Sequence, residues 1–129
     1  MAMTTLLIVD HDDDLRDTLE DSLDEMGFDC LSVISAEDSI DVLGIFNPEI
    51  AIVDASLSSN DGEPSVKIIQ RLRPNCAVIA THADWDGLSE DDILQKALEV
   101  GANRAIAKPY TVDGMVKVIE IVKRQRSAG

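Results

Sequence analysis

The sequence predicts an α/β fold in which a parallel sheet is covered by helices on both faces. Short apolar runs alternate with longer segments whose apolar residues recur at helical spacing, and this alternation repeats five times. The apolar runs lack a polar face, which is typical of strands buried on both sides. Right-handed crossovers between such strands produce a doubly wound sheet, so we expect a (βα)5 domain.

Five short runs fit the predicted strands. Each is rich in apolar residues and is bounded by turn-forming or polar residues. The fifth run is the weakest of the set. The predicted strands are residues 5–9, 30–34, 49–53, 76–81 and 103–107.

The first two helices are predicted after the first two strands. One ends at Gly27, because glycine is favoured just past a helix terminus. The next begins at Ser35, with Asp38 at the capping-box position, and ends before Pro48. The residues expected to face the core are Leu15, Leu19, Leu23 and Met26 in the first helix, and Ile40 and Leu43 in the second.

Three further helices are predicted in the second half of the chain. Pro64 suits the first turn of the third helix, and Pro74 ends it. The fourth is capped by Ser89 and followed by Gly101, and the fifth is capped by Thr111. The residues expected to face the core are Val66, Ile69 and Leu72 in the third helix, and Met115, Val118, Ile119 and Val122 in the fifth.

Length and charge exclude several classes of protein. The 129 residues suit a single domain, which we expect over 1–129 with no output domain. A formal charge of −14 repels phosphate backbones and anionic lipid, so we expect no direct binding to nucleic acid. No apolar stretch approaches the roughly 18 residues of a membrane span, and no basic leader precedes the first strand. We therefore expect a cytoplasmic protein that does not bind membranes.

Two cysteines occur in the chain, Cys30 and Cys76. Each begins an apolar run. Two cysteines in a chain of this length do not form a disulfide framework. We expect both to be buried thiols.

Two carboxylates end apolar strands. Asp10 follows the first strand and Asp54 follows the third. Ligands of doubly wound sheets bind at the carboxyl ends of the strands, near the topological switch point. A pair of acids at that edge is costly unless a cation or a phosphoryl group binds there. The sequence therefore points to a cation or phosphoryl site.

A wider motif set resembles the response-regulator receiver domain of two-component signal transduction. Its parts are Leu6-Leu7-Ile8-Val9-Asp10, Asp54, Asp61-Gly62, Thr81 and Lys108-Pro109. They keep the order and approximate spacing of the family over essentially the whole chain. The resemblance implies a flavodoxin-like five-stranded parallel sheet with strand order 2-1-3-4-5.

The resemblance also implies a role for each site residue. Asp54 would accept a phosphoryl group from a sensor histidine kinase or a phosphotransfer protein. Asp10, Asp54 and the backbone carbonyl of Ser56 would hold Mg²⁺, the metal that the family uses. Lys108 would pair with Asp54, and Thr81 would contact the phosphoryl group. The Lys108–Pro109 peptide bond would be cis.

The sequence departs from the family pattern at two site positions. His11 stands where the family usually has a second acid, and imidazole is a poor ligand for Mg²⁺. We therefore expect weak Mg²⁺ binding, with His11 a doubtful ligand. Ala105 stands where the family usually has an aromatic residue that moves together with the residue equivalent to Thr81. The methyl group of Ala105 cannot gate the pocket as an aromatic ring does.

A third departure is a longer segment after Thr81. The extra length lies in residues 82–87, which include Trp85, the only tryptophan of the chain. This segment is either an ordinary surface loop, or a lid or partner contact that replaces the missing aromatic.

The last helix has an apolar arc wider than one buried face requires, because Val116 and Ile121 flank its core stripe. Either this helix is buried more widely within the domain, or it forms a partner surface. The second alternative predicts a partner surface or a homodimer through the fourth and fifth helices.

The leading prediction is a receiver in a phosphorelay that signals to an unidentified downstream protein by direct interaction. It is not expected to be an enzyme, apart from its own phosphoryl transfer and autodephosphorylation. One alternative is a degenerate receiver that binds partners without phosphorylation. A remote alternative is a haloacid-dehalogenase-like phosphatase with Asp10 as the nucleophile, although the chain is short for that fold plus its cap.

Overall fold

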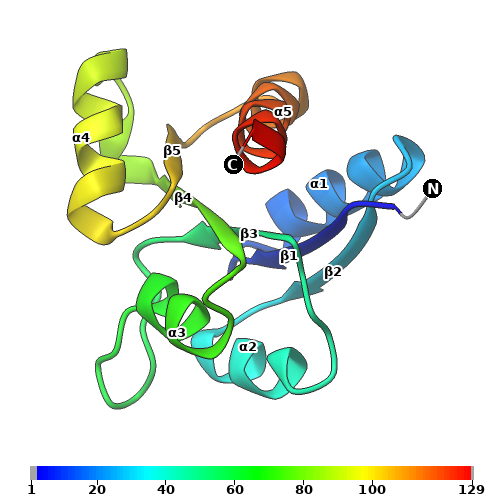
Figure 1. Ribbon diagram of the computed structural model, residues 1–129. Coiled ribbons are helices and arrows are strands. Elements are labelled where there is room, and N and C mark those ends of the chain that lie inside the picture. The colour runs from blue at the N-terminus through cyan, green and yellow to red at the C-terminus, as the bar shows by residue number, and fades with distance from the viewer. Residues whose placement is uncertain (1–2, 129) are drawn as a thin grey trace.

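The computed structural model describes residues 3–128 and contains a five-stranded parallel sheet with helices on both sides (Figure 1). The order is β2-β1-β3-β4-β5, which confirms the predicted fold class and strand order. The strands are β1 (Thr5–Val9), β2 (Asp29–Val33), β3 (Ile50–Asp54), β4 (Ala77–His82) and β5 (Arg104–Ala107). Of the domain expected over 1–129, residues 1, 2 and 129 lie outside the described residues.

The helices alternate with the strands along the chain. They are α1 (Asp13–Glu25), α2 (Ala36–Leu43), α3 (Ser65–Leu72), α4 (Glu90–Val100) and α5 (Val112–Ala128), with a short 3-10 helix, η1 (Ala83–Trp85), between β4 and α4. Each predicted N-cap serine or threonine accepts a hydrogen bond from a backbone N–H of the first turn. The donors are Asp38 for Ser35, Asp92 for Ser89 and Gly114 for Thr111. Gly101 ends α4 with a φ of 80°, a conformation that glycine adopts without strain.

Two apolar layers cover the two faces of the sheet. The α1/α5 layer contains Ile8, Ile52 and Ile79 from the strands, packed with residues of α1 and α5. The α2/α3 layer contains Val9, Val53 and Ala80 with residues of α2 and α3, and it continues toward α4 (Figure 1). Full burial of one large aliphatic side chain is worth about 1.5–3 kcal/mol, so both layers contribute strongly to stability. The strand ends that carry the acids are therefore held by a packed core on each side.

Three burial predictions are wrong. Met26 is exposed because it is the C-cap of α1 and lies beyond the last buried turn. Ile40 is exposed because Ala36, Ser39 and Leu43 occupy the inner face of α2. Cys76 is buried as expected, whereas Cys30, in the edge strand β2, is only half-buried.

Candidate functional site

Four polar side chains meet at the carboxyl edge of the sheet on the α1/α5 side. Successive residues of a strand point to opposite faces, so a residue two positions after a buried isoleucine points to the same face. In each case the polar residue follows an isoleucine of the α1/α5 layer at this spacing. The pairs are Ile8 and Asp10, Ile52 and Asp54, Ile79 and Thr81, and Ile106 and Lys108.

Lys108 bridges the two acids. Its Nζ lies 2.7 Å from Asp10 Oδ2 and 2.9 Å from Asp54 Oδ2. Asp10 and Asp54 are only 3% and 4% exposed, so their mutual repulsion is weakly screened by water. The ammonium group offsets that repulsion. The expected pairing of Lys108 with Asp54 is confirmed, and so is the cis peptide bond between Lys108 and Pro109.

The charge states of this pair follow from their contacts. Burial acts to raise the pKa of Asp54, but hydrogen bonds from Lys108 and Ser56 outweigh it and hold this pKa below its ordinary value. Burial acts to lower the pKa of Lys108, but hydrogen bonds to Asp10 and Asp54 hold it above its ordinary value. At neutral pH the site therefore contains an ionised Asp54 beside a protonated Lys108.

Ser56 holds the other oxygen of Asp54. Its backbone N–H and its hydroxyl donate to Asp54 Oδ1 over 2.9 and 2.7 Å. Lys108 holds Oδ2, so both oxygens of this carboxylate are oriented. The sequence analysis assigned only the backbone carbonyl of Ser56 and missed the side chain. The Asp-x-Ser spacing was the available signal, because aspartate side chains commonly accept from the backbone two residues on.

The loop after β1 orients Asp10. Asp10 Oδ1 accepts from the backbone N–H of Asp12 over 2.9 Å, and its carbonyl accepts from Arg16 Nη1 over 2.9 Å. Arg16 also donates to Asp13 over 2.7 Å, which ties the start of α1 to the site. Sequence reasoning missed Arg16. Arg16 is the only lysine or arginine before Lys67, in a stretch rich in acidic residues, and this pattern could have indicated a specific contact.

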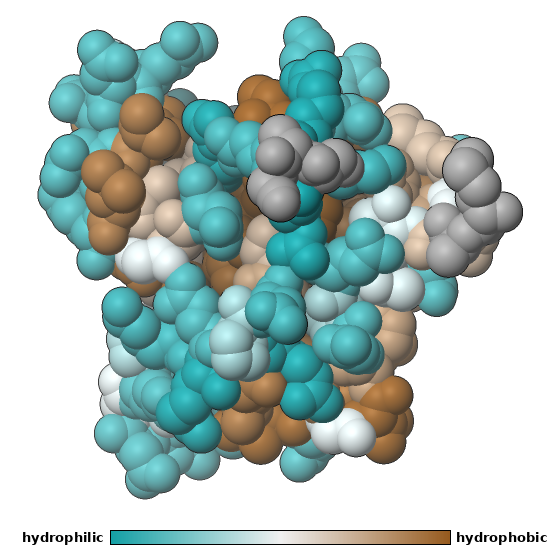
Figure 2. All heavy atoms as spheres, viewed as in Figure 1, coloured by the Kyte–Doolittle hydropathy of each residue, from teal (hydrophilic) through white to brown (hydrophobic). Residues whose placement is uncertain are grey.

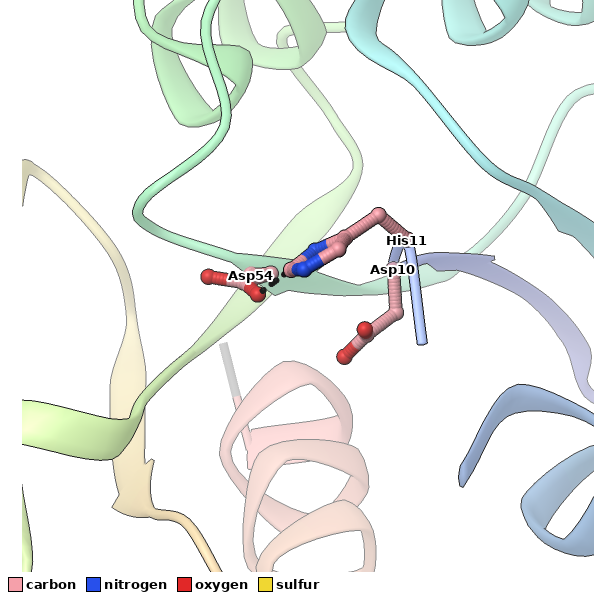
Figure 3. A group of neighbouring side chains, drawn as sticks. All are labelled: Asp10, His11 and Asp54. Carbon is pink, nitrogen blue, oxygen red and sulfur yellow. Dashed lines mark ion pairs between the residues drawn. The ribbon is translucent and has the colours of Figure 1, made fainter. Parts of the chain in front are cut away.

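His11 turns its ring toward Asp54, as Figure 3 shows, with Nδ1 at 3.7 Å from Asp54 Oδ2. The side chain is 65% exposed, so it lies at the mouth of the site. Single ligand atoms of Asp10, His11 and Asp54 lie within 4.8 Å of one another, close enough to share one metal ion. The two carboxylates are the hard oxygen donors that Mg²⁺ prefers, and the imidazole is not.

Thr81 supplies a buried hydroxyl beside Asp54. The two residues are register partners in β3 and β4, and Thr81 is almost fully buried. Its Oγ1 has no hydrogen-bond partner among the described residues. A buried donor left without a partner costs about 1–3 kcal/mol. The hydroxyl is therefore available to an acceptor atom added to Asp54.

Of the alternatives left open for the segment after β4, a surface loop, a lid or a partner contact, the structure contradicts a lid that carries Trp85 over the site. Trp85 is only 5% exposed and belongs to the α2/α3 layer. Its indole lies against the His82 ring, with 5.3 Å between the ring centroids. Ala105 and Ala107 of β5 pack against the same layer. The aromatic ring near β5 therefore comes from η1 and not from β5 itself.

A groove of about 430 Å³ runs between α4, β5 and α5. Most of the residues that line the groove are apolar: Ile93, Leu94, Ala105, Ile106, Val118 and Ile121. Three charged residues, Glu90, Asp91 and Arg104, complete the lining. Further along α4, Leu98 is 67% exposed. Figure 2 shows apolar side chains gathered at the surface over α4.

Known proteins resemble this chain over nearly its whole length. The family model described as "Response regulator receiver domain" matches residues 6–120. Sporulation initiation phosphotransferase F of Bacillus subtilis is 25% identical over 113 residues, which cover 88% of each protein. A cyclic di-GMP phosphodiesterase of Thermotoga maritima is 28% identical over 109 residues, which cover 84% of this chain and 28% of that protein.

Solved structures agree on the fold. A response regulator from Desulfuromonas acetoxidans matches with a TM-score of 0.81 and 18% identity, over 95% of this chain and 98% of that one. The chain spans between 23% and 56% of the length of four of the curated relatives that it matches. Within residues 3–128, no helix has the length and apolar character needed to cross a membrane.

Proposed function

Because the chain belongs to the response regulator receiver domain family, we propose that Asp54 accepts a phosphoryl group from a sensor histidine kinase or a phosphotransfer protein. Phosphorylation and Mg²⁺ binding are typical of this family, whose receiver domains are generally signalling modules without enzymatic activity. The observation that carries the proposal is the buried pair of Asp10 and Asp54 bridged by Lys108. A site with these charges suits the transfer of an anionic group onto a carboxylate.

The proposed reaction uses the residues already described. One oxygen of Asp54 attacks phosphorus as the bond to the donor imidazole nitrogen breaks, and that imidazole takes up a proton. The positive charge of Lys108 offsets the negative charge that gathers on the phosphoryl oxygens. Thr81 Oγ1, which has no partner among the described residues, donates to one of those oxygens.

We propose that Mg²⁺ binds beside this pair. Asp10, Asp54 and the backbone carbonyl of Ser56 would hold it, and their oxygen atoms fit this metal. When bound, it would neutralise charge on the phosphoryl oxygens. His11 replaces an oxygen donor by a nitrogen, so the affinity is expected to be lower than usual for the family.

Intact-mass measurement tests the phosphoacceptor. The wild-type chain incubated with Mg²⁺ and acetyl phosphate should gain the mass of one phosphoryl group, and Asp54→Asn should gain none. Asp61→Asn is the matched control, because Asp61 is an exposed acid on the loop that follows β3. Equal mass gain in wild type and in Asp54→Asn would contradict the proposal.

The same measurement separates the two alternative functions. A degenerate receiver, which His11 and Ala105 favour, would gain no mass in any variant and would bind its partner without phosphorylation. A phosphatase-like reaction would place the phosphoryl group on Asp10. Fragmentation of the labelled chain locates the modified residue and so distinguishes these outcomes.

We also propose the α4/β5/α5 groove as the contact surface for a second copy or a downstream partner. The support is the exposed apolar surface of α4 together with Ile121 of α5, which is half-buried and lines the groove. Val116 faces a different hollow, beside Phe28. Sedimentation should show a mass increase on phosphorylation that Leu98→Glu removes. An unchanged monomer at high concentration would argue against the dimer.

A further inference from the structure

We propose that the His82–Trp85 pair reports the phosphorylation of Asp54 to α4. This inference depends on the proposed function, because it assumes that Asp54 takes a phosphoryl group. It assigns the readout to η1, whereas β5 has only alanine at the position of the family's aromatic residue. Three structural links carry the inference.

The first link joins the site to His82. Thr81 precedes His82 directly, and the carbonyl of His82 accepts from the backbone N–H of Lys108 over 3.0 Å. The carbonyl of Thr81 accepts from the backbone N–H of Ala55, the residue after Asp54, over 2.8 Å. The backbone of His82 is therefore bonded to Thr81 on one side and hydrogen-bonded to Lys108 on the other, and the side chains of both residues would contact the phosphoryl group. A shift of either one moves the His82 backbone.

The second link joins His82 to η1. The His82 side chain points to the opposite side of the sheet from Thr81, since neighbouring residues of a strand alternate. Its ring lies against Trp85 at 5.3 Å between centroids, with 34° between the ring planes. Its Nδ1 accepts from the backbone N–H of Asp84 over 3.0 Å and so caps the 3-10 helix. The imidazole thus fixes both the start of η1 and its buried ring.

The third link joins η1 to α4. The carbonyl of Trp85 accepts from the backbone N–H of Leu88 over 3.1 Å, and Ser89, the next residue, is the N-cap of α4. η1 also contacts β5, whose Ala105 and Ala107 pack against the apolar layer that contains Trp85. The small side chains of β5 leave room for the indole. Movement of Trp85 therefore passes directly to the first turn of α4.

The links predict a direction of change. A phosphoryl group on Asp54 gives Thr81 Oγ1 the acceptor that it lacks among the described residues and draws Thr81 and Lys108 toward it. The His82 backbone follows, and its ring withdraws from Trp85. The indole then gains contact with water, and the first turn of α4 loses part of its support. A ligand shifts a conformational equilibrium by its differential interaction with the two states, and here that interaction is the Thr81 hydrogen bond.

Two readouts on one sample test the proposal. The chain is treated with Mg²⁺ and acetyl phosphate, and intact mass gives the phosphorylated fraction. Because Trp85 is the only tryptophan, its emission reports η1 alone. We expect a shift of emission to longer wavelength that follows the phosphorylated fraction. We also expect amides in the first turn of α4 to exchange about fivefold faster or more, the lower end of typical coupling between sites.

Three variants test whether the response of α4 to phosphorylation depends on the His82 ring or only on an aromatic ring buried at position 85. In His82→Ala, phosphorylation should proceed while the response of the α4 amides is lost. Trp85→Phe keeps an aromatic ring in the core and should retain the α4 response, and thermal unfolding checks that both variants fold. Asp86→Asn, an exposed change just after η1, is the matched control and should behave as wild type.

The outcomes distinguish the inference from the function beneath it. No mass gain in wild type would refute the proposed function. Mass gain with unchanged Trp85 emission and unchanged α4 exchange would refute the readout through η1 and leave Asp54 as phosphoacceptor. A full α4 response in folded His82→Ala would also overturn it.

Discussion

The two sides of the sheet differ in how closely they follow the receiver pattern. On the α1/α5 side, each of the four strands that reach the site has a residue of the family motif at or next to its carboxyl end: Asp10, Asp54, Thr81 and Lys108. On the α2/α3 side lie three of the departures, which are His82, Ala105 and the buried Trp85. His11 is the exception, because its ring faces Asp54 at the mouth of the site. Successive side chains of a strand point to opposite faces of the sheet, so neighbouring residues such as Thr81 and His82 fall on different sides. Apart from His11, the α1/α5 side thus keeps the family's residues for phosphoryl chemistry, whereas the other departures lie on the α2/α3 side.

This separation suggests that the chemistry and its readout vary independently. The acids and Lys108 contact one another directly, so a change in one leaves a buried charge without its partner. The rings of His82 and Trp85 contact the site only through the backbone of β4. Substitutions on the α2/α3 side should therefore alter signalling with less effect on phosphoryl transfer.

The largest expected effect comes from Lys108→Ala. Loss of the ammonium removes the charge that offsets both acids and the incoming phosphoryl oxygens, and removal of one such group typically costs about 10²-fold or more in rate. The rate of mass gain with acetyl phosphate measures it. His82→Ala, at the same strand edge but on the other side, is the matched control and should stay near the wild-type rate. Equal losses in both variants would break the separation between the two sides.

A smaller effect is expected from His11→Asp. This change places a carboxylate where the imidazole now lies near Asp54, and it adds a hard oxygen donor. Mg²⁺ affinity should rise by about tenfold, or about 1.4 kcal/mol. Titration calorimetry measures it, and His11→Asn separates the gain of an oxygen ligand from the gain of negative charge. No change in either variant would mean that His11 does not influence the metal site.

Strand periodicity made the fold and half of the site predictable. Buried runs that end in Asp10 and Asp54 place both acids at one edge of the sheet whatever the details of the loops. The bridge from Lys108 to both acids follows the same logic, because β5 carries it to that edge. The motif resemblance then supplied the strand order and the expected roles.

The missed features depend on tertiary contacts that have no period in the sequence. The segment of Trp85 was left open as a surface loop, a lid or a partner contact, but a single turn of 3-10 helix directs the Trp85 ring into the core. Arg16 reaches back to the Asp10 carbonyl from the first turn of α1, which depends on how that turn sits at the sheet edge. Ile40 is apolar yet exposed, since Ala36, Ser39 and Leu43 take the buried positions of α2. In each case packing overrode local pattern.

The smallest of these effects concerns Ser56, whose hydroxyl and backbone N–H both donate to Asp54 Oδ1. Ser56→Ala removes only the hydroxyl, while the backbone N–H of residue 56 and the ammonium of Lys108 still donate to Asp54. The pKa of Asp54 should rise toward its ordinary value of 3.8. NMR titration of the carboxylate measures this change, and Ser58→Ala, an exposed serine on the same loop, is the control.

The same substitution has a defined effect on acid stability. A carboxylate whose folded pKa is depressed stabilises the fold above its unfolded pKa, and this contribution is lost as pH falls through the folded pKa. Asp54 therefore stabilises the protein above about pH 3.8 and loses that contribution at lower pH. Raising the folded pKa by Ser56→Ala should reduce stability at neutral pH and start the acid loss at a higher pH. Urea unfolding across this range measures both, and identical curves for Ser56→Ala and wild type would show that the backbone N–H and Lys108 alone orient Asp54.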